Sequence, residues 1–273
     1  MAPGSVDAAF FAQHGYAAFS TGASAGDITR WTALADDSLR RYLDLAAATG
    51  FPVTPGKKNG FRELVMKDPN RYDCNFDNAP ANDPAAAAFC RTMEDHIAMA
   101  AGPLLREVLG PSYKKNSQGM VTSQLGAHAQ GWHVDSSHLF VGPPGQYGSL
   151  PCHFVTVFVP LFRSSIPIGP TEMVPGSHKV TCDLANEEVP DQYPTAAKAE
   201  ALIHASGGGT GVLDFHPGDV IVMDGRVLHR GLANRLQRRH LVYCSYMRPW
   251  YFEWPRSHSD DRSLFAARPK SSL

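Results

Sequence analysis

Two short stretches of the sequence carry the residue types that a metal site needs. In the first, His133 and Asp135 flank one residue at the end of an expected strand, where side chains two apart point to the same face. In the second, an apolar run with a turn at Asp224-Gly225 leads to His229. Two imidazoles and one carboxylate, with other coordination positions left open, form the facial triad of non-haem Fe(II) oxygenases. The pattern therefore predicts a metal site made by His133, Asp135 and His229.

A His-x-Asp triplet alone is weak evidence, because twelve His in 273 residues allow such triplets to arise by chance. A second triplet, His258-Ser259-Asp260, is an internal control: no apolar strand precedes it and no later His completes a site. We interpret it as a solvated loop. His153, His178 and His216 are expected to be structural or surface residues. His216, the best rival of His229 as third ligand, precedes its strand instead of following it.

A basic cluster follows the second histidine, and its last arginine opens the next expected strand. Residues 239–247 are rich in β-branched and aromatic side chains, as strands are. Alternation would place Arg239 on one face with Leu241, Tyr243 and Ser245, toward the metal cavity. A guanidinium there can bind a dicarboxylate through two parallel hydrogen bonds. The alternative for any one arginine of the cluster is a solvated turn.

Four segments follow one another in an order that a known family shares. Residues 11–19 are similar to its opening helix and strand, and residues 130–135 (Gln-Gly-Trp-His-Val-Asp) hold the His-x-Asp pair. Residues 169–179 contain a Pro-Gly-Ser-His block, and Asn234 and Arg239 follow His229. In these motifs, and over most of its length, the chain resembles the phytanoyl-CoA dioxygenase family of Fe(II)- and 2-oxoglutarate-dependent oxygenases.

The resemblance implies a chemistry and a role for each matched residue. His133, Asp135 and His229 would hold Fe(II), and 2-oxoglutarate would chelate the metal while its far carboxylate pairs with Arg239. Gln130 and Thr171 match family positions that touch the cosubstrate. With O2 as the other cosubstrate, the protein would hydroxylate or otherwise oxidise a small organic molecule and release succinate and CO2. Halogenation is disfavoured, because Asp135 occupies the position that a halogenating relative leaves open for chloride.

Three departures from the family pattern bear on these expectations. The interval from His229 to Arg239 is about one residue shorter than in the family, which leaves Arg238 as a rival; strand alternation favours Arg239. Residues 168–170 replace the Asn-Gly that often precedes the Pro-Gly-Ser-His block. The last four residues only loosely resemble the peroxisomal address Ser-Lys-Leu, because the middle basic residue is missing. A cytoplasmic location is therefore expected ahead of a peroxisomal one.

Two other functions use the same triad. A zinc-dependent hydrolase would employ His133, Asp135 and His229 but would leave Arg239 and Gln130 without a purpose. A non-catalytic metal-binding jelly roll is the other alternative, and no residue favours it. The substrate is not specified, since the aromatic stretch of residues 247–254 is as consistent with a packing strap as with the lining of a substrate pocket.

Composition limits the class of protein. A chain of 273 residues, 43% hydrophobic and 19% charged, can bury one jelly-roll-sized core. A formal net charge of -1 gives no electrostatic basis for nucleic acid or an anionic membrane, so a small-molecule substrate is expected. No apolar run approaches the roughly 20 residues of a membrane helix, and no signal peptide is expected at residues 1–4. Five scattered cysteines indicate reduced thiols in a cytosol-like compartment.

The expected elements form one domain, mainly β with flanking helices. Residues 1–118 are expected to be mainly helical support, 119–248 the jelly-roll core and 249–273 a tail. Strands are expected at residues 120–125, 153–161, 171–174, 211–215, 220–224, 226–232 and 239–247. Short strands at this spacing favour a sandwich or jelly roll, and the family resemblance implies a cupin-like double-stranded β-helix. The longer connections, residues 136–152 and 180–209, are expected at the barrel mouth, where they could act as lids.

Two helices are expected in the first part of the chain. One covers residues 27–48, with Ser24 and Asp27 as a capping box. The other starts at Asp83-Pro84 and runs to residue 110, with a possible break at residues 102–103. Between the helices, residues 51–82 are expected to be a long irregular segment. Its polar residues either reach a substrate or form a solvated basic loop; they are Arg62, Lys67, Arg71 and Tyr72.

Overall fold

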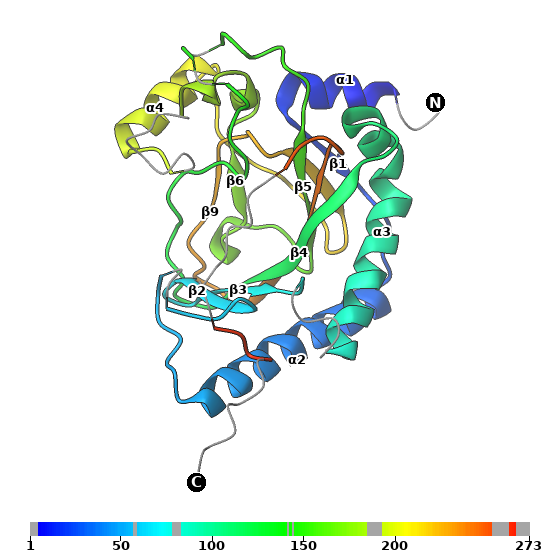
Figure 1. Cartoon of the computed structure of the whole chain (residues 1–273), viewed down its shortest axis with the longest axis vertical. Coiled ribbons are helices and arrows are strands. Elements are labelled where there is room, and N and C mark those ends of the chain that lie inside the picture. Colours follow the sequence, from blue (N-terminus) through cyan, green and yellow to red (C-terminus); the bar gives the residue numbers. More distant parts are fainter. Residues whose placement is uncertain are drawn as a thin grey trace.

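Two antiparallel sheets face each other at the centre of the molecule, and two long helices cover the outer side of the larger one (Figure 1). The computed structural model describes residues 5–56, 59–77, 83–140, 142–143, 145–184, 193–252 and 262–265. The large sheet has the strand order β1-β8-β5-β10-β4-β3-β2, and the small one has the order β7-β6-β9. This is the mainly β jelly roll with flanking helices that the sequence predicts.

The helices and strands have the following bounds. The helices are α1 (Ser5–His14), α2 (Ala25–Thr49), α3 (Pro84–Leu109) and α4 (Ala196–Ala205), with the short 3-10 helices η1 (Ile166–Ile168), η2 (Ser177–Lys179) and η3 (Thr181–Leu184). The strands are β1 (Tyr16–Phe19), β2 (Leu64–Asp68), β3 (Arg71–Asn75), β4 (Lys114–Ser123), β5 (Phe154–Pro160), β6 (Thr171–Met173), β7 (Gly211–Val212), β8 (Val220–Asp224), β9 (His229–Gly231) and β10 (Arg239–Met247).

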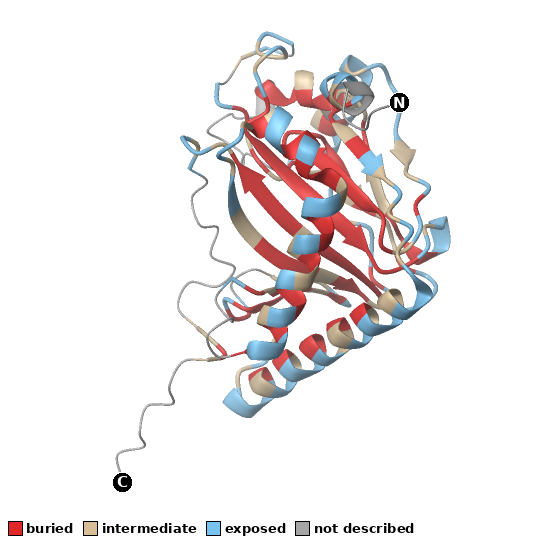
Figure 2. Ribbon diagram, turned by 90° about the vertical axis from the view of Figure 1, so that its right-hand side faces the viewer, coloured by how far each residue is buried: buried red, intermediate tan, exposed pale blue. Residues whose placement is uncertain are grey.

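Alternation along the strands divides the interior into an outer and an inner core. On β10, Val242 and Cys244 pack with apolar residues of α2 and α3 in the outer core. Leu241 and Tyr243 point the other way and join an inner cluster that also contains Phe158 and Met173, one from each sheet. Figure 2 shows the strands buried, while the helices are exposed on their outward faces. The inner face of the large sheet is therefore the wall against which a site between the sheets must form.

The two long helices begin where their caps predict. Ser24 accepts a hydrogen bond from the Asp27 backbone at the start of α2, and Asp83 accepts one from the Ala86 backbone at the start of α3. The possible break at residues 102–103 is absent, because α3 continues through Pro103 to Leu109. Its last turns bury Leu104, Leu105 and Leu109, and this packing holds the helix together where proline removes a backbone hydrogen bond.

The prediction of an irregular segment over residues 51–82 is wrong in its centre. Residues 64–75 form the hairpin β2-β3, which turns at Asn70 with φ 64° and extends the large sheet beyond β4. Its inward face carries charged side chains, among them Arg71 and Asp73, so the apolar alternation that marks a strand in sequence is missing. With β1, this places three strands in the part of the chain expected to be mainly helical.

The strands from β4 onward lie where they were expected, with different ends. β7 and β9 are shorter than the predicted residues 211–215 and 226–232, and β4 begins earlier, at Lys114. The connection of residues 180–209 contains η3 and α4 in its described part. None of the described helices has the length and apolarity that crossing a membrane requires.

Candidate functional site

The three candidate metal ligands meet at the edge of the small sheet. His133 forms an isolated antiparallel bridge to His229, with both backbone N–H groups donating across it at 2.9 Å. The Asp135 backbone N–H donates to the Gly225 carbonyl at 2.8 Å. One ligand atom from each residue lies within 4.8 Å of the others, and Nε2 of His229 is 3.6 Å from Oδ1 of Asp135. Two segments distant in the chain thus bring the predicted triad to one point.

Hydrogen bonds behind the triad fix which atoms face the centre. Nδ1 of His133 donates to the Gly131 carbonyl at 3.0 Å, and Nδ1 of His229 donates to the Val227 carbonyl at 3.0 Å. A carbonyl only accepts, so each Nδ1 carries the proton and each Nε2 has a free lone pair. The Thr156 hydroxyl donates to Oδ2 of Asp135 at 2.6 Å. Such support is what orients the ligands of a metal site.

The electrostatics of the triad suit a cation. Burial, together with the neighbouring His229, lowers the pKa of His133 to about 3, so its imidazole is neutral and able to ligate at neutral pH. Burial acts to raise the pKa of Asp135, but both imidazoles and the Thr156 hydroxyl outweigh it and hold this pKa below its ordinary value. The set offers two neutral nitrogens and one carboxylate, which fits the donors of a non-haem Fe(II) site.

A tight turn between β8 and β9 positions both parts of the triad. Asp224 and Arg226 form a buried ion pair at 2.7 Å, and Arg226 also donates to the Leu150 carbonyl. Between them, the Gly225 carbonyl accepts from the backbones of Asp135 and Ser136. A Cβ added at Gly225 would lie 2.6 Å from the Phe154 ring, so only glycine fits there. The turn therefore ties the His-x-Asp segment to the strand that carries His229.

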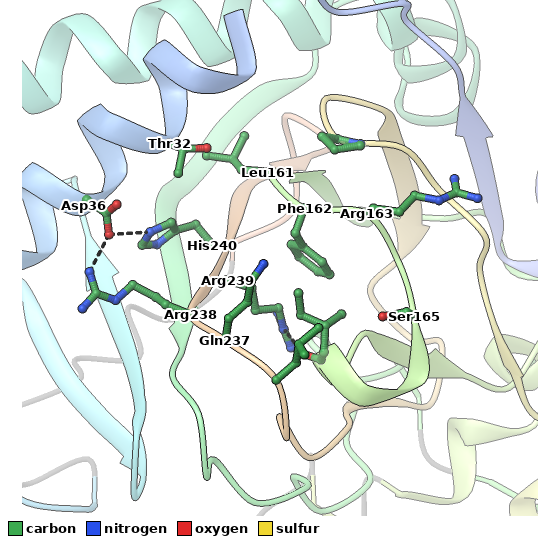
Figure 3. Close-up of a pocket in the computed structure, with 13 residues that line it drawn as sticks. Thr32, Asp36, Leu161, Phe162, Arg163, Ser165, Gln237, Arg238, Arg239 and His240 are labelled. Atoms are coloured by element: carbon green, nitrogen blue, oxygen red, sulfur yellow. Dashed lines mark hydrogen bonds and ion pairs between the residues drawn. The ribbon is translucent and has the colours of Figure 1, made fainter. Parts of the chain in front are cut away.

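The two rival arginines, Arg238 just before β10 and Arg239 at its first residue, point in different directions (Figure 3). Arg238 is half exposed and pairs with Asp36 of α2 at 2.7 Å. Arg239 is 2% exposed, and its guanidinium stacks on the Phe162 ring at 4.9 Å. Its Nε donates to the Ile168 carbonyl at 3.2 Å and its Nη2 to the Gly169 carbonyl, while Nη1 is buried without a hydrogen-bond partner. Arg239 is therefore the arginine that turns inward with an unsatisfied donor.

A cavity of about 570 Å³ opens between α2 and the start of β10, and its lining also includes Phe162, Ile168 and Arg239 (Figure 3). Asp36, Arg238 and His240 lie along it, and Asp36 accepts from both of the other two. The metal-binding triad is not part of its lining. Of the candidate site residues, Arg238 and Arg239 line this cavity.

The other two cosubstrate candidates flank Gly231. The side-chain oxygen of Gln130 accepts from the Gly231 backbone at 3.0 Å, and Thr171 is the register partner of Gly231 in the small sheet. Thr171 lies on the same face of β6 as Met173, whose side chain belongs to the inner core. Both residues thus contact or pair with Gly231, two residues after His229 on β9.

Three further charged or polar residues lie near the triad; the sequence left Lys67 open as a substrate-reaching residue and gave no role to Asp73 and Tyr243. Lys67 stands at a bulge in β2 and pairs with Asp73 at 2.8 Å, and the Tyr243 hydroxyl donates to the same carboxylate at 3.0 Å. Burial opposes the charge of Lys67, but Asp73 and the more distant Asp135 raise its pKa. Asp73 and Tyr243 belong to no recognisable sequence motif. Lys67 lies at a β-bulge, and the periodicity of the sequence does not reveal a bulge, so the direction of its side chain could not be predicted.

One aromatic ring covers the triad from the mouth of the site. Tyr193 stacks on His133 with ring centroids 5.2 Å apart and an interplanar angle of 20°. Tyr193 belongs to the connection expected to act as a lid. Of the aromatic stretch, Tyr251 lies 3.1 Å from the Ser136 hydroxyl and packs on His153, next to the loop that follows Asp135.

The remaining histidines lie apart from the triad. His153 and His178 donate to the Ser137 and Ala12 carbonyls from buried positions. His216 precedes a turn in which its backbone donates to Asp219. Within the described ranges, the triad is the one group of three potential ligands close enough to share a metal ion. The control triplet at residues 258–260 lies outside the described residues.

Comparison with known proteins gives one family and one fold. A sequence model of the phytanoyl-CoA dioxygenase family matches residues 11–240. The structure is similar to that of EctD from S. alaskensis in its apoform, with TM-score 0.60 and 18% identity over 98% of this chain and 85% of that one. It is also similar to AviO1 from Streptomyces viridochromogenes Tue57, with TM-score 0.59 and 20% identity over 91% and 96%.

A third similar structure was solved with ligands. HygX from Streptomyces hygroscopicus, with nickel and 2-oxoglutarate bound, has TM-score 0.59 and 17% identity over 93% of this chain and 90% of that one. At these identities the likeness shows the shared fold. The family match spans every candidate ligand and cosubstrate residue, from Gln130 to Arg239.

Proposed function

Because the chain belongs to the phytanoyl-CoA dioxygenase family of Fe(II)- and 2-oxoglutarate-dependent oxygenases, we propose that His133, Asp135 and His229 are its iron ligands. The protein is a non-haem iron dioxygenase that acts on a small organic molecule. The observation that carries the ligand assignment is the convergence of one atom from each residue within 4.8 Å, with both Nδ1 atoms occupied by carbonyls. Each ligand atom is therefore oriented before a metal binds.

We propose further that 2-oxoglutarate lies between the triad and Arg239. The buried Nη1 of Arg239 lacks a partner in the protein, and a buried guanidinium donor without an acceptor is costly. A carboxylate of the cosubstrate would satisfy it. Gln130 and Thr171, on either side of Gly231, would contact the cosubstrate from the small sheet.

The residues around the site divide the work. Bound Fe(II), with 2-oxoglutarate and O2, supplies the oxidising power, and the cosubstrate leaves as succinate and CO2. Thr156 holds Asp135 in place by its hydrogen bond, and Phe158 lies 6.4 Å from the His229 ring in the inner core, where apolar neighbours exclude water. Tyr193, stacked on His133, would limit access from the mouth. With a carboxylate in the triad, we propose hydroxylation or a related oxidation and not halogenation.

A reducing, cytosol-like compartment is proposed for this enzyme. All five cysteines are buried and unpaired, and burial raises the pKa of Cys74 and Cys152 well above the ordinary value. Buried protonated thiols suit a compartment in which disulfides do not form.

Anaerobic titration with Fe(II) and then 2-oxoglutarate tests the assignment. A visible charge-transfer absorption should appear with the wild-type protein and should be lost in His133→Ala. Zinc bound to the same residues should give no such absorption, which separates the oxygenase from a zinc hydrolase. Iron binding without the absorption would contradict the proposed cosubstrate site and would revive the zinc or non-catalytic alternative.

A further inference from the structure

Arg239 belongs to a row of polar side chains that crosses three neighbouring strands. Ser123 at the end of β4 is the register partner of Arg239 on β10 and of Arg71 on β3. Residues directly opposite each other in a sheet project to the same face, with Cβ atoms about 4.5–5.5 Å apart. Arg71, Ser123 and Arg239 therefore stand side by side on the inner face of the large sheet, and their exposed fractions are 0%, 0% and 2%.

Each member of this row has a buried donor without a hydrogen-bond partner. The atoms are Nε of Arg71, the hydroxyl oxygen of Ser123 and Nη1 of Arg239. Buried polar atoms in folded proteins are nearly always satisfied, and an unsatisfied one is destabilising. Three in one row indicate that a common acceptor belongs between them.

The two guanidiniums are held by backbone carbonyls that lie next to each other. Arg71 donates to the carbonyls of His128 and Leu232, at 2.7 and 3.1 Å. Arg239 donates to the Gly169 carbonyl, and a Cβ added at Gly169 would lie only 2.6 Å from the Leu232 oxygen. Both side chains are thus held by loop segments next to the small sheet, and the orientation of their remaining donors is fixed.

The row concentrates positive charge, and none of the described carboxylates lies within hydrogen-bond distance of it. Asp68 is the carboxylate beside Arg71, at 3.8 Å and partly exposed. Burial and the neighbouring Arg71 lower the pKa of Arg239 to about 9, and burial also lowers the pKa of Arg71. Two cations that destabilise each other in a buried site favour an anion between them.

We propose that Arg71, Ser123 and Arg239 together bind the distal carboxylate of 2-oxoglutarate, so that this chain clamps its cosubstrate with two arginines and a serine. The inference rests on the proposed function of the same site. A carboxylate has two oxygens with lone pairs enough for all three donors. Arg239 and the triad border the same inner core. Arg239 contacts Phe162 and His229 contacts Phe158, and both phenylalanines belong to that core. A cosubstrate that chelates the metal can therefore extend its distal carboxylate toward the row.

The test compares two keto acids that differ at the distal end. 2-Oxopentanoate has the same chain length as 2-oxoglutarate and the same chelating end, but a methyl group replaces the distal carboxylate. Dissociation constants for both come from the charge-transfer absorption in anaerobic Fe(II) titrations. Ser123→Ala is the central variant, since the hydroxyl it removes makes no hydrogen bond in the protein and its loss should leave the fold intact.

Ser123→Ala should raise the dissociation constant of 2-oxoglutarate about tenfold, since a hydrogen bond to a charged group is lost. Arg71→Gln keeps an amide that can donate to the backbone carbonyls. It should raise the dissociation constant of 2-oxoglutarate by at least about thirtyfold. Neither variant should change the dissociation constant of 2-oxopentanoate by more than about twofold. Thr122→Val is the matched control: Thr122 is adjacent on β4, faces outward to His240, and should leave both constants unchanged.

The outcomes separate the two proposals. If the wild-type protein gives the absorption but Ser123→Ala and Arg71→Gln bind 2-oxoglutarate as tightly as the wild type, the clamp is wrong and the iron site stands. Equal weakening of both keto acids would also contradict the clamp, because the variants would then disturb the whole site. If the wild-type protein gives no absorption, the proposed function and the clamp fail together.

Discussion

Arg238 and Arg239 are neighbours in the chain, yet they have unrelated surroundings because strand alternation sends them to opposite faces. Arg238 meets Asp36 in solvent, where an ion pair contributes little. Arg239 is buried under Phe162 with a free donor. The sequence spacing from His229 leaves both arginines possible as the cosubstrate ligand. The pairing of Arg239 with Ser123 of β4 shows which of them begins β10 and faces inward.

Replacing each arginine by glutamine should give very different results. Arg239→Gln should raise the dissociation constant of 2-oxoglutarate by about a hundredfold, since it removes a buried charged partner of a carboxylate. Arg238→Gln should change the dissociation constant by no more than about twofold. Calorimetric titration of the Fe(II) protein under nitrogen measures both. A larger effect at position 238 would show that the register of β10 is off by one residue.

Two side chains, those of Gln130 and Arg71, leave no room for a Cβ at Gly231. A Cβ at this position would lie 2.6 Å from Oε1 of Gln130 and 2.8 Å from Nη1 of Arg71, which is itself held by two carbonyls. We expect Gly231→Ala to destabilise the protein by about 1–3 kcal/mol and to weaken the binding of 2-oxoglutarate. Gly211→Ala, with nothing within 4 Å of the added atom, is the control. Equal unfolding midpoints in urea for the two variants would argue against this crowding.

At the level of elements, the turn between β8 and β9 links stability to the metal site. The pair Asp224–Arg226 is buried, and its arginine reaches the loop at Leu150. Burial acts to raise the pKa of Asp224, but Arg226 outweighs it and holds this pKa well below the ordinary value. The carboxylate therefore remains charged, and the turn remains tied, at all but strongly acidic pH.

This pair gives the unfolding free energy a defined pH dependence. Because the pKa of Asp224 is lower in the folded than in the unfolded state, its contribution is complete above about pH 3.9, the unfolded value. It is lost as pH falls below that value toward the folded pKa. Asp224→Asn should destabilise the protein by about 3–5 kcal/mol at pH 7, and its deficit relative to wild type should shrink below pH 4. Urea unfolding at pH 3 to 7 measures this, and a deficit independent of pH would contradict it.

The sequence predicts an element well when its buried face is apolar or its end has a capping residue. The caps at Ser24 and Asp83 and the strands β5, β8 and β10 follow from local chemistry and apolar runs. β2 and β3 do not, because their inward residues include charged ones, among them Arg71 and Asp73. The row formed by Arg71, Ser123 and Arg239 depends on pairing between strands far apart in sequence, which a motif within one segment cannot reveal.

For the whole molecule, the short strand β1 protects an edge of the large sheet. It pairs with β8, whose residues Val220–Asp224 are all buried. Removing residues 1–20 would leave a hydrophobic strand with unpaired backbone groups, which is a template for aggregation. We expect the shortened chain to be less stable and to form oligomers, as measured by light scattering against the full chain. A monomeric shortened chain with the same melting temperature would show that β1 is dispensable.

The strand order also determines when the molecule can fold during its synthesis. β10, the last strand of the described chain, lies between β4 and β5 in the middle of the large sheet. Until the ribosome releases it, β4 with its hairpin and β5 with β8 are two separate half-sheets, each with an open edge. Because Arg239 belongs to β10, a nascent chain would have neither a closed sheet nor a complete binding site. The large sheet of this enzyme can therefore close only after β10 has been translated, and until then the two open edges can pair with other chains.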